Sequence, residues 1–375
     1  MQARTFFLYM SICLTSYATI GQSIDTYIHS IDSLRAQKGY TDALAKVNEA
    51  ILRYPGNLPL LKAKGCILSD LRRHNEAVEV FTAYLKKKPN DVAVLALRGN
   101  SRYLSQDPEM ALVDYNRSIQ LDPTRPEAFY LRGRYYTGKR DDKSAKNDYL
   151  RVYKMDSNYL LVRHNLGNIY RRLGVFDSAV FFFSKVLQSD PDNADYIKYR
   201  AECRYEIGDN KGSLDDALRL MELDPDELSA PWIAGLASWE LRKYDETLKY
   251  LNMCVARDSA NTNFFWARSV VYDTLKNYQE SLTDLNKCIE LDSSSAKYYL
   301  TRGFMQLIKF ENFKAALNDY NRAIQLEPNY GKAYLYRGMF YADFSSNREQ
   351  ACADLKKAHE YGYDPKMETY KKYCQ

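Results

Sequence analysis

The chain has no arrangement of residues that is typical of an active site. Its four histidines are far apart in the sequence, and no two of them are paired on one helix. They are His29, His74, His164 and His359. No glycine-rich phosphate loop, no nucleophile elbow, no C-x-x-C motif and no zinc-site spacing is present. We therefore predict that the chain is not an enzyme and that it has no metal site and no cofactor.

A unit of 34 residues recurs along the chain and must position any binding residues. It is clearest in residues 160–193, LLVRHNLGNIYRRLGVFDSAVFFFSKVLQSDPDN. There, positions 8, 11, 15, 20, 24 and 32 hold Gly167, Tyr170, Gly174, Ala179, Phe183 and Pro191. The unit resembles the tetratricopeptide repeat, a helix-turn-helix unit of the same period.

Ten such units start near residues 24, 58, 92, 126, 160, 194, 228, 262, 296 and 331 and form one continuous repeat region, 22–365. Small residues at positions 8 and 20 let the two helices of a unit approach closely. Proline at position 32 ends the second helix, and polar residues at position 34 are placed to cap the next one. These cap residues are Asn57, Asp91, Asn193, Asn261 and Ser295. The resemblance implies an all-α, right-handed α-solenoid in which stacked units bury a continuous core.

The two ends of the chain differ from the repeats. Residues 1–21 have an early Arg4, an apolar run, and Thr19-Ile20-Gly21 before Gln22, which indicates a secretory signal peptide. An uncleaved anchor is the alternative. Residues 366–375 are expected to form a helix that caps the last repeat. We expect an exported protein of bacterial type, in the periplasm, secreted or at the cell surface, without a transmembrane segment in the mature chain.

The charge of the chain is nearly balanced. It has 53 basic and 48 acidic residues, a net charge of +5. This balance is not typical of a protein that binds nucleic acid, so no nucleic-acid partner is expected.

An arginine at position 7 accompanies an aspartate at position 23 in six units, and the four units without the arginine also lack the aspartate. We predict an ion pair within each of the six units, with a structural role. The pairs are Arg98 with Asp114, Arg132 with Asp148, Arg200 with Asp216, Arg268 with Asp284, Arg302 with Asp319, and Arg337 with Asp354.

The cysteines leave one candidate disulfide. Cys254 and Cys288 hold the same position in adjacent repeats, which is too far apart for a bond. Cys352 lies in the last repeat and Cys374 in the expected capping helix. The two form a disulfide in an oxidising compartment and stay free in a reducing one.

In tetratricopeptide repeats the first helix lines the concave groove, through positions 2, 5, 6, 9, 12 and 13. By this resemblance the fourth to sixth units offer a polar segment and the seventh to ninth an apolar, aromatic one. The polar segment is Arg134, His164, Asn165, Asn168, Arg171, Arg172, Lys198, Tyr199 and Glu202. The apolar segment is Trp232, Ile233, Leu236, Trp239, Trp266, Val270, Leu300 and Phe304, and it contains all three tryptophans.

Two interpretations of the apolar segment stay open. Its aromatic residues either anchor a peptide or partner helix, or fill a tightly packed interior without a ligand. His164 and Asn168 stand where some members of the family place a carboxylate clamp, but Tyr199 replaces the expected asparagine, so that clamp is incomplete. The function we expect is a non-catalytic scaffold or adaptor that binds another protein. The alternative is a binder of glycans or other non-protein ligands that stack on the tryptophans.

Overall fold

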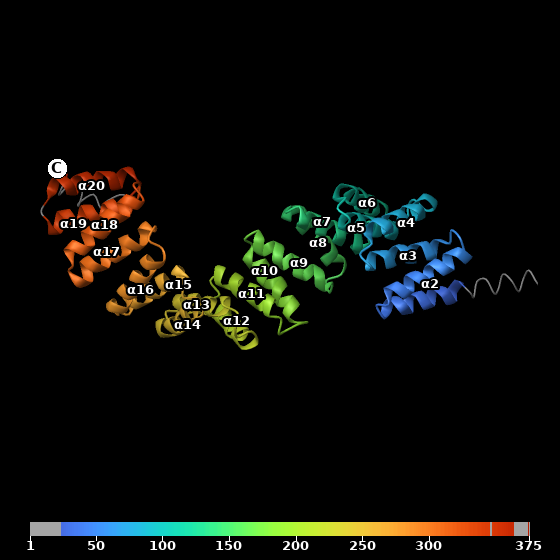
Figure 1. The fold of residues 1–375 in the computed structure, drawn as a ribbon, viewed down its shortest axis with the longest axis horizontal. Coiled ribbons are helices and arrows are strands. Elements are labelled where there is room, and N and C mark those ends of the chain that lie inside the picture. Colours follow the sequence, from blue (N-terminus) through green and yellow to red (C-terminus); the bar gives the residue numbers. More distant parts are fainter. Residues whose placement is uncertain (1–23, 346, 364–373, 375) are drawn as a thin grey trace, which may run out of the picture. The chain divides into compact units, whose positions relative to one another are not determined.

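The computed structural model describes residues 24–345, 347–363 and 374. The predicted signal peptide, and the predicted capping helix apart from Cys374, lie outside the described residues. The chain divides into two compact units, residues 1–186 and 187–375. Every regular element in the described part is a helix, and each unit is a stack of helix pairs in chain order (Figure 1). This confirms the predicted all-α solenoid class.

The first unit contains five helix pairs. The first pair is a helix over residues 24–36 with α2 (Tyr40–Arg53). The others are α3 (Leu58–Asp70) with α4 (His74–Lys87), α5 (Val92–Leu104) with α6 (Pro108–Leu121), α7 (Pro126–Gly138) with α8 (Asp142–Met155), and α9 (Leu160–Arg172) with α10 (Phe176–Leu187).

The second unit also contains five pairs. They are α11 (Ala194–Glu206) with α12 (Asn210–Leu223), α13 (Ser229–Glu240) with α14 (Tyr244–Arg257), α15 (Thr262–Thr274) with α16 (Tyr278–Leu291), α17 (Ala296–Phe310) with α18 (Phe313–Leu326), and α19 (Gly331–Phe344) with α20 (Arg348–Glu360). The second helix of a pair packs against the first helix of the next pair, as α14 does against α15 and α16 against α17.

Glycine at position 8 makes room for an aromatic ring at position 24. A Cβ atom on Gly133 would lie 2.6 Å from Tyr149, and one on Gly167 would lie 2.7 Å from Phe183. Both rings are buried. Gly235 faces Leu251 instead, and the nearest atom of that leucine would be 3.6 Å away. The glycine is therefore required in the repeats where a ring lies on it, and it leaves free space in the repeat of α13 and α14.

The cap residues behave as expected with one exception. The side chains of Asn57, Asp91, Asn193 and Asn261 each accept a hydrogen bond from a backbone N–H in the first turn of the following helix. Ser295 precedes α17 but its side chain makes no such bond, so the prediction was wrong at this residue.

Candidate functional site

The apolar pocket of the second unit lies between α13 and α15. It is lined by four of the predicted groove residues, Leu236 and Trp239 from α13 and Trp266 and Val270 from α15. Gly235, Thr247, Leu251, Ala267 and Val271 complete the lining. Its volume is about 190 Å³. Thr247 is the one polar residue in this lining, so the pocket suits an apolar group.

A second pocket, which we call the mixed pocket, adjoins the first one at Trp266. Its lining combines Trp232, Phe264 and Trp266 with polar side chains, and its volume is about 480 Å³. The polar residues are Ser229, Asn261, Asn263 and Lys297, and Leu228 completes the lining. The rings of Trp232 and Phe264 are tilted, with centroids 5.2 Å apart. Trp266 is the one residue that lines both pockets.

Lys297 gives the mixed pocket a positive charge. Its Nζ atom lies 3.2 Å from the centroid of the Trp266 ring, in a cation–π contact. Desolvation lowers the pKa of this lysine. The buried indole Nε1 of Trp266 has no hydrogen-bond partner among the described residues. The pocket therefore offers an apolar aromatic surface together with a cation.

Three predicted members of the apolar segment lie outside these pockets. Phe304 is exposed, and its ring contacts Tyr336 of α19 at 5.3 Å between centroids. Ile233 and Leu300 were wrongly predicted to line the groove. They are only 5% and 3% exposed, because each packs into a core cluster between neighbouring helices.

The polar groove residues divide between the two units. In the first unit, Asn168 donates hydrogen bonds to the ring and to the carbonyl oxygen of His164, each at 3.3 Å. Arg134, Asn165 and Arg171 are half-buried. Arg172 was predicted to face the groove, but its Nε donates to Asp142 of α8 at 2.9 Å, so it ties two repeats together.

In the second unit, the remaining polar groove residues lie on α11. Lys198 forms an ion pair of 3.1 Å with Glu227 and lies over the half-buried Tyr199. Glu202 is also half-buried.

A pocket in the first unit was missed by the sequence analysis. It lies between α5 and α7, has a volume of about 370 Å³, and includes Ala96, Leu97 and Asn100 of α5 with Tyr130 and Leu131 of α7. These residues hold groove positions 5, 6 and 9 of the third and fourth repeats. The same position rule, applied to those repeats, would have found it.

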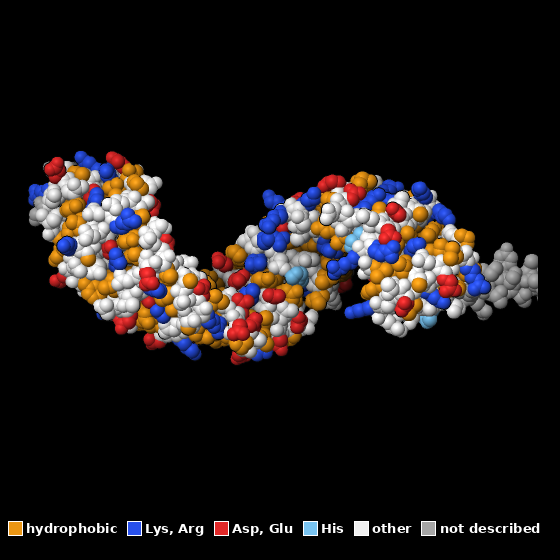
Figure 2. All heavy atoms as spheres, in the orientation of Figure 1, with side chains coloured by type: hydrophobic (Ala, Val, Ile, Leu, Met, Phe, Trp, Pro, Cys, Tyr) orange, Lys and Arg blue, Asp and Glu red, His pale blue; other side chains and the backbone are white. Residues whose placement is uncertain are grey.

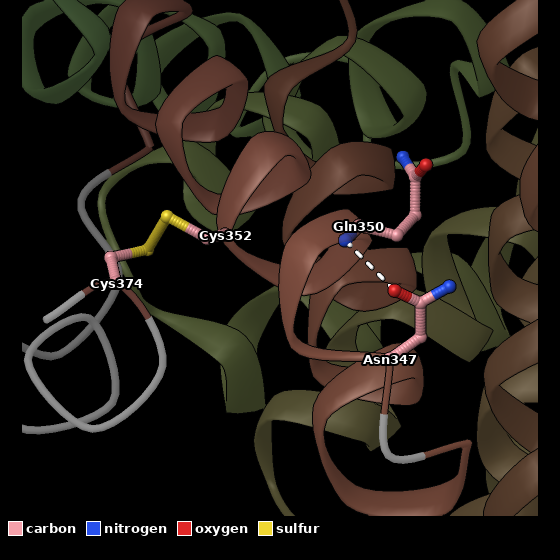
Figure 3. The surroundings of a disulfide bond; sticks show 4 residues. All are labelled: Asn347, Gln350, Cys352 and Cys374. Carbon is pink, nitrogen blue, oxygen red and sulfur yellow. Dashed lines mark hydrogen bonds between the residues drawn. A yellow bond between two sulfur atoms is a disulfide. The ribbon is translucent and has the colours of Figure 1, made fainter.

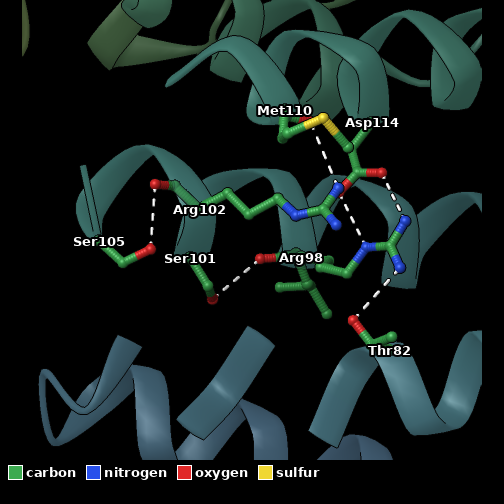
Figure 4. Close-up of polar contacts among 8 residues, drawn as sticks. Thr82, Arg98, Ser101, Arg102, Ser105, Met110 and Asp114 are labelled. Carbon is green, nitrogen blue, oxygen red and sulfur yellow. Dashed lines mark hydrogen bonds and ion pairs between the residues drawn. The ribbon is translucent and has the colours of Figure 1, made fainter. Parts of the chain in front are cut away.

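The six arginines each pair with the aspartate of their own repeat. In the pair of Arg98 and Asp114, the Nε and Nη2 atoms donate to the two carboxylate oxygens at 2.9 and 2.7 Å (Figure 4). The other five pairs have the same two-pronged geometry, with distances of 2.7 to 2.8 Å. All six aspartate side chains are at most 8% exposed.

A second partner of these arginines was missed. The Nη1 atom of Arg268 donates to Asn252 of the preceding repeat at 2.8 Å, and Arg132, Arg302 and Arg337 bond in the same way to an asparagine. Arg98 bonds Thr82, which holds the same repeat position, 25. Two of the repeats that lack the arginine start near residues 160 and 228. In the repeat before each of them, position 25 is a leucine, Leu150 and Leu218 respectively. This pattern was visible in the sequence. Five of the arginines therefore join their own repeat to the one before it, namely Arg98, Arg132, Arg268, Arg302 and Arg337.

Two further hydrogen-bonded arginines reinforce this network. Arg102 and Arg204 donate to Asp114 and Asp216 at 2.8 and 2.9 Å, so each of these carboxylates receives two arginines. The side-chain hydrogen bonds with Asp284 raise the pKa of the Arg268 guanidinium. Acidic and basic side chains both occur over each unit on the face that Figure 2 shows.

The described cysteines include a bonded pair and two buried thiols that hold the same repeat position. Cys352 and Cys374 form a disulfide with a Cα–Cα distance of 5.0 Å (Figure 3). Cys254 and Cys288 are buried and free, and burial raises their pKa values to about 11 and about 12. The described residues contain no group of three His, Cys, Asp or Glu side chains that could hold a metal ion. No helix in the described part is long and apolar enough to cross a membrane.

Comparison with known proteins identifies the repeat. Two family models, both described as tetratricopeptide repeat, match residues 162–193 and 263–295, and residues 62–126. Anaphase-promoting complex subunit 3 of Schizosaccharomyces pombe is 25% identical over 182 residues, which cover 48% of this chain and 27% of that protein. A DnaJ homolog subfamily C member 7 homolog of the same yeast is 23% identical over 227 residues, which cover 59% of this chain and 42% of that protein. The chain thus spans less than half the length of these relatives.

Solved structures give the same type of match. The crystal structure of a tetratricopeptide repeat protein from Parabacteroides merdae aligns with 67% of this chain and 99% of its own, at 20% identity and a TM-score of 0.49. The 34-residue register, the ten helix pairs and the matched family models together show that this chain is a tetratricopeptide repeat protein.

Proposed function

We propose that the protein is a non-catalytic scaffold or adaptor that binds a peptide or partner protein on the first-helix face of its second unit. The observation that carries the proposal is the pair of adjoining pockets around Trp266. Aromatic anchors in preformed apolar pockets supply most of the binding energy in many protein interfaces.

The size and chemistry of the apolar pocket favour a side chain of a polypeptide. Its volume of about 190 Å³ is smaller than the roughly 300–1,000 Å³ of typical small-molecule sites. It therefore suits one large apolar side chain, while the backbone of the ligand continues toward the mixed pocket. One relative, anaphase-promoting complex subunit 3, is by its name a component of a protein complex, which fits a scaffold role.

A glycan ligand is the second candidate, and the asparagines of the mixed pocket favour it. Asn261 and Asn263 could hydrogen-bond to sugar hydroxyl groups beside Trp232. A stacking sugar also needs a free indole face, however, and Lys297 already covers one face of Trp266. The peptide is therefore the better candidate.

We also propose that the protein works outside the cytoplasm, at the cell surface or in the periplasm. The disulfide between Cys352 and Cys374 supports this location, since such bonds persist mainly in oxidising compartments. The expected signal peptide over residues 1–21 points in the same direction.

The experiment is a binding assay with matched aromatic variants. The wild type, Trp239→Ala, Trp266→Ala and a control, Phe181→Ala, are used to capture partners from envelope and secreted extracts and to probe peptide and glycan arrays. Phe181 is a suitable control because it is an exposed aromatic residue on α10. Circular dichroism confirms that each variant is folded.

The proposal predicts that both tryptophan variants lose the captured protein and the bound peptides, while the control keeps them. Intrinsic fluorescence gives a second readout, because all three tryptophans line these pockets. Retention of the partner by both variants would refute the site. Binding only on the glycan array would establish the alternative.

A further inference from the structure

Lys297 is placed where a positive charge does not stabilise the helix. It is the second residue of α17, and the N-terminus of a helix favours negative charge. At the same repeat position, α7 and α11 carry the acidic residues Glu127 and Asp195. The ammonium group of Lys297 lies against Trp266, and no carboxylate of the described residues is within ion-pair distance of it. Neither helix electrostatics nor a salt bridge explains this lysine.

The next repeat has a lysine at the same position. Lys332 is the second residue of α19 and lies 5.6 Å from the ring centroid of Tyr336. It too forms no ion pair in the described part of the chain. Tyr336 in turn contacts Phe304 of α17, so Lys332, like Lys297, lies beside aromatic side chains of first helices.

Several other lysines of the chain do have acidic partners. Lys46, Lys88, Lys139, Lys198, Lys243 and Lys287 each form an ion pair of 2.7 to 3.5 Å. Other lysines, such as Lys146 and Lys249, also lie near aromatic rings and form no ion pair in the described part of the chain. Lys297 and Lys332 differ from them because they lie in the first turn of a helix, in two successive repeats.

The two helices that carry most of the apolar pocket end near acidic residues. Glu240 is the last residue of α13, and Asp273 is near the end of α15. The two following first helices, α17 and α19, instead carry a lysine in the first turn, Lys297 and Lys332. A ligand with acidic groups beside these two lysines complements their charge.

We propose that the bound segment is an acidic amphipathic peptide, whose apolar side chains enter the pockets around Trp266 and whose carboxylates pair with Lys297 and Lys332. This inference rests on the proposed function and narrows it to one class of ligand. Lys297 is exposed, so a carboxylate of the ligand can reach its ammonium and form a charge-assisted hydrogen bond with it. The apolar surface continues beyond the pockets through Phe304, Ile308 and Met339, all of which are exposed.

The test uses an array of synthetic peptides in matched pairs. Each peptide carries tryptophan, phenylalanine or leucine anchors, with glutamate in one member of the pair and glutamine in the other, and with a free or an amidated C-terminus. The full chain is compared with the double variant Lys297→Gln, Lys332→Gln. The matched control is Lys287→Gln, Lys314→Gln, which removes the same charge from α16 and α18.

The wild type and the control should bind the glutamate peptides about five- to tenfold more tightly than the glutamine peptides. The variant Lys297→Gln, Lys332→Gln should lose this preference but bind the glutamine peptides as tightly as the wild type does. A preference confined to free C-termini identifies a terminal carboxylate as the source of the charge. Binding of apolar peptides without a glutamate preference, or a preference retained by the double variant, overturns this inference and leaves the proposed function intact. If no peptide binds at all, the proposed function fails as well.

Discussion

Removal of Arg268 alone should damage the protein more than removal of both members of its ion pair. Asp284 is 4% exposed and accepts two hydrogen bonds from Arg268, at 2.8 and 2.7 Å. In Arg268→Leu this carboxylate stays buried and loses its guanidinium partner. In Arg268→Leu, Asp284→Leu the charges are replaced by two apolar side chains of similar size, so nothing charged remains buried at that point.

The magnitudes follow from burial. Breaking a buried pair by removal of one partner costs about 3–5 kcal/mol, whereas replacement of both partners by apolar residues is often nearly neutral. We expect Arg268→Leu to cost about 3–4 kcal/mol. Asp284→Leu should cost about 2–3 kcal/mol, because the arginine is 17% exposed and keeps its bond to Asn252. The double variant should lose about 1–2 kcal/mol, since the exposed Asn252 can bond water instead.

The loss should not depend on pH in the neutral range. The side-chain hydrogen bonds with Asp284 raise the pKa of the Arg268 guanidinium above its ordinary value. A group whose pKa is higher in the folded state stabilises the fold fully at pH values below its unfolded-state pKa. This stabilisation is lost only as the pH rises through the folded-state pKa. Between about pH 6 and 9 the arginine is charged in both states.

Hydrogen exchange of α15 and α16 in the full-length chain is the appropriate assay. Solenoids open repeat by repeat, so a single global unfolding curve would not report on this pair alone. The exposed pair of Lys287 and Glu290 in the same repeat is the control, with an expected coupling of at most about 0.5 kcal/mol. Losses that simply add, or a double variant that is no more stable than Arg268→Leu, would refute the reasoning.

Three further predictions concern other parts of the chain. Gly133→Ala should lower the stability of the folded chain by about 1–3 kcal/mol, because the new Cβ would lie 2.6 Å from Tyr149. Gly235→Ala should be neutral or stabilise the fold by up to about 1 kcal/mol. Urea unfolding of the two variants compares these effects. The hydrogen bonds from Arg172 lower the pKa of Asp142 in the folded state below its ordinary value of 3.8. The ion pair therefore stabilises the folded state at pH values above 3.8, and this stabilisation is lost as the pH falls through the folded-state pKa. Asp142→Asn should therefore cost up to about 1 kcal/mol at pH 7 and almost nothing near pH 2, in thermal unfolding at both pH values. Cys352→Ser should cost about 3 kcal/mol, because the disulfide closes a loop with a sequence separation of 22, and reductant should have the same effect on the wild type but none on the variant.

Much of the fold could be predicted from the sequence because the same residue types recur at fixed positions. The pairing of Arg98 with Asp114, and of the five equivalent pairs, follows from residues that occur together in the same units. Burial was harder to predict. Ile233 and Trp232 are neighbours in the sequence, yet the first packs into a core cluster and the second lines a pocket. A rule that assigns a role to each repeat position cannot separate them, because burial also depends on the size of the side chains in the adjoining repeats.

The apolar pocket itself shows why the site could be predicted only in part. In most repeats with glycine at position 8, an aromatic ring at position 24 fills the space beside it, as Tyr149 does beside Gly133. The repeat of α13 and α14 keeps the glycine, Gly235, but has Leu251 in place of the ring, and both residues line the pocket. The pocket thus results from a missing ring, while the tryptophans that suggested a site form its walls. Leu251→Phe should fill this space and weaken ligand binding, while α13 and α15 stay folded. Because this variant keeps the tryptophans, it tests whether binding requires the cavity itself.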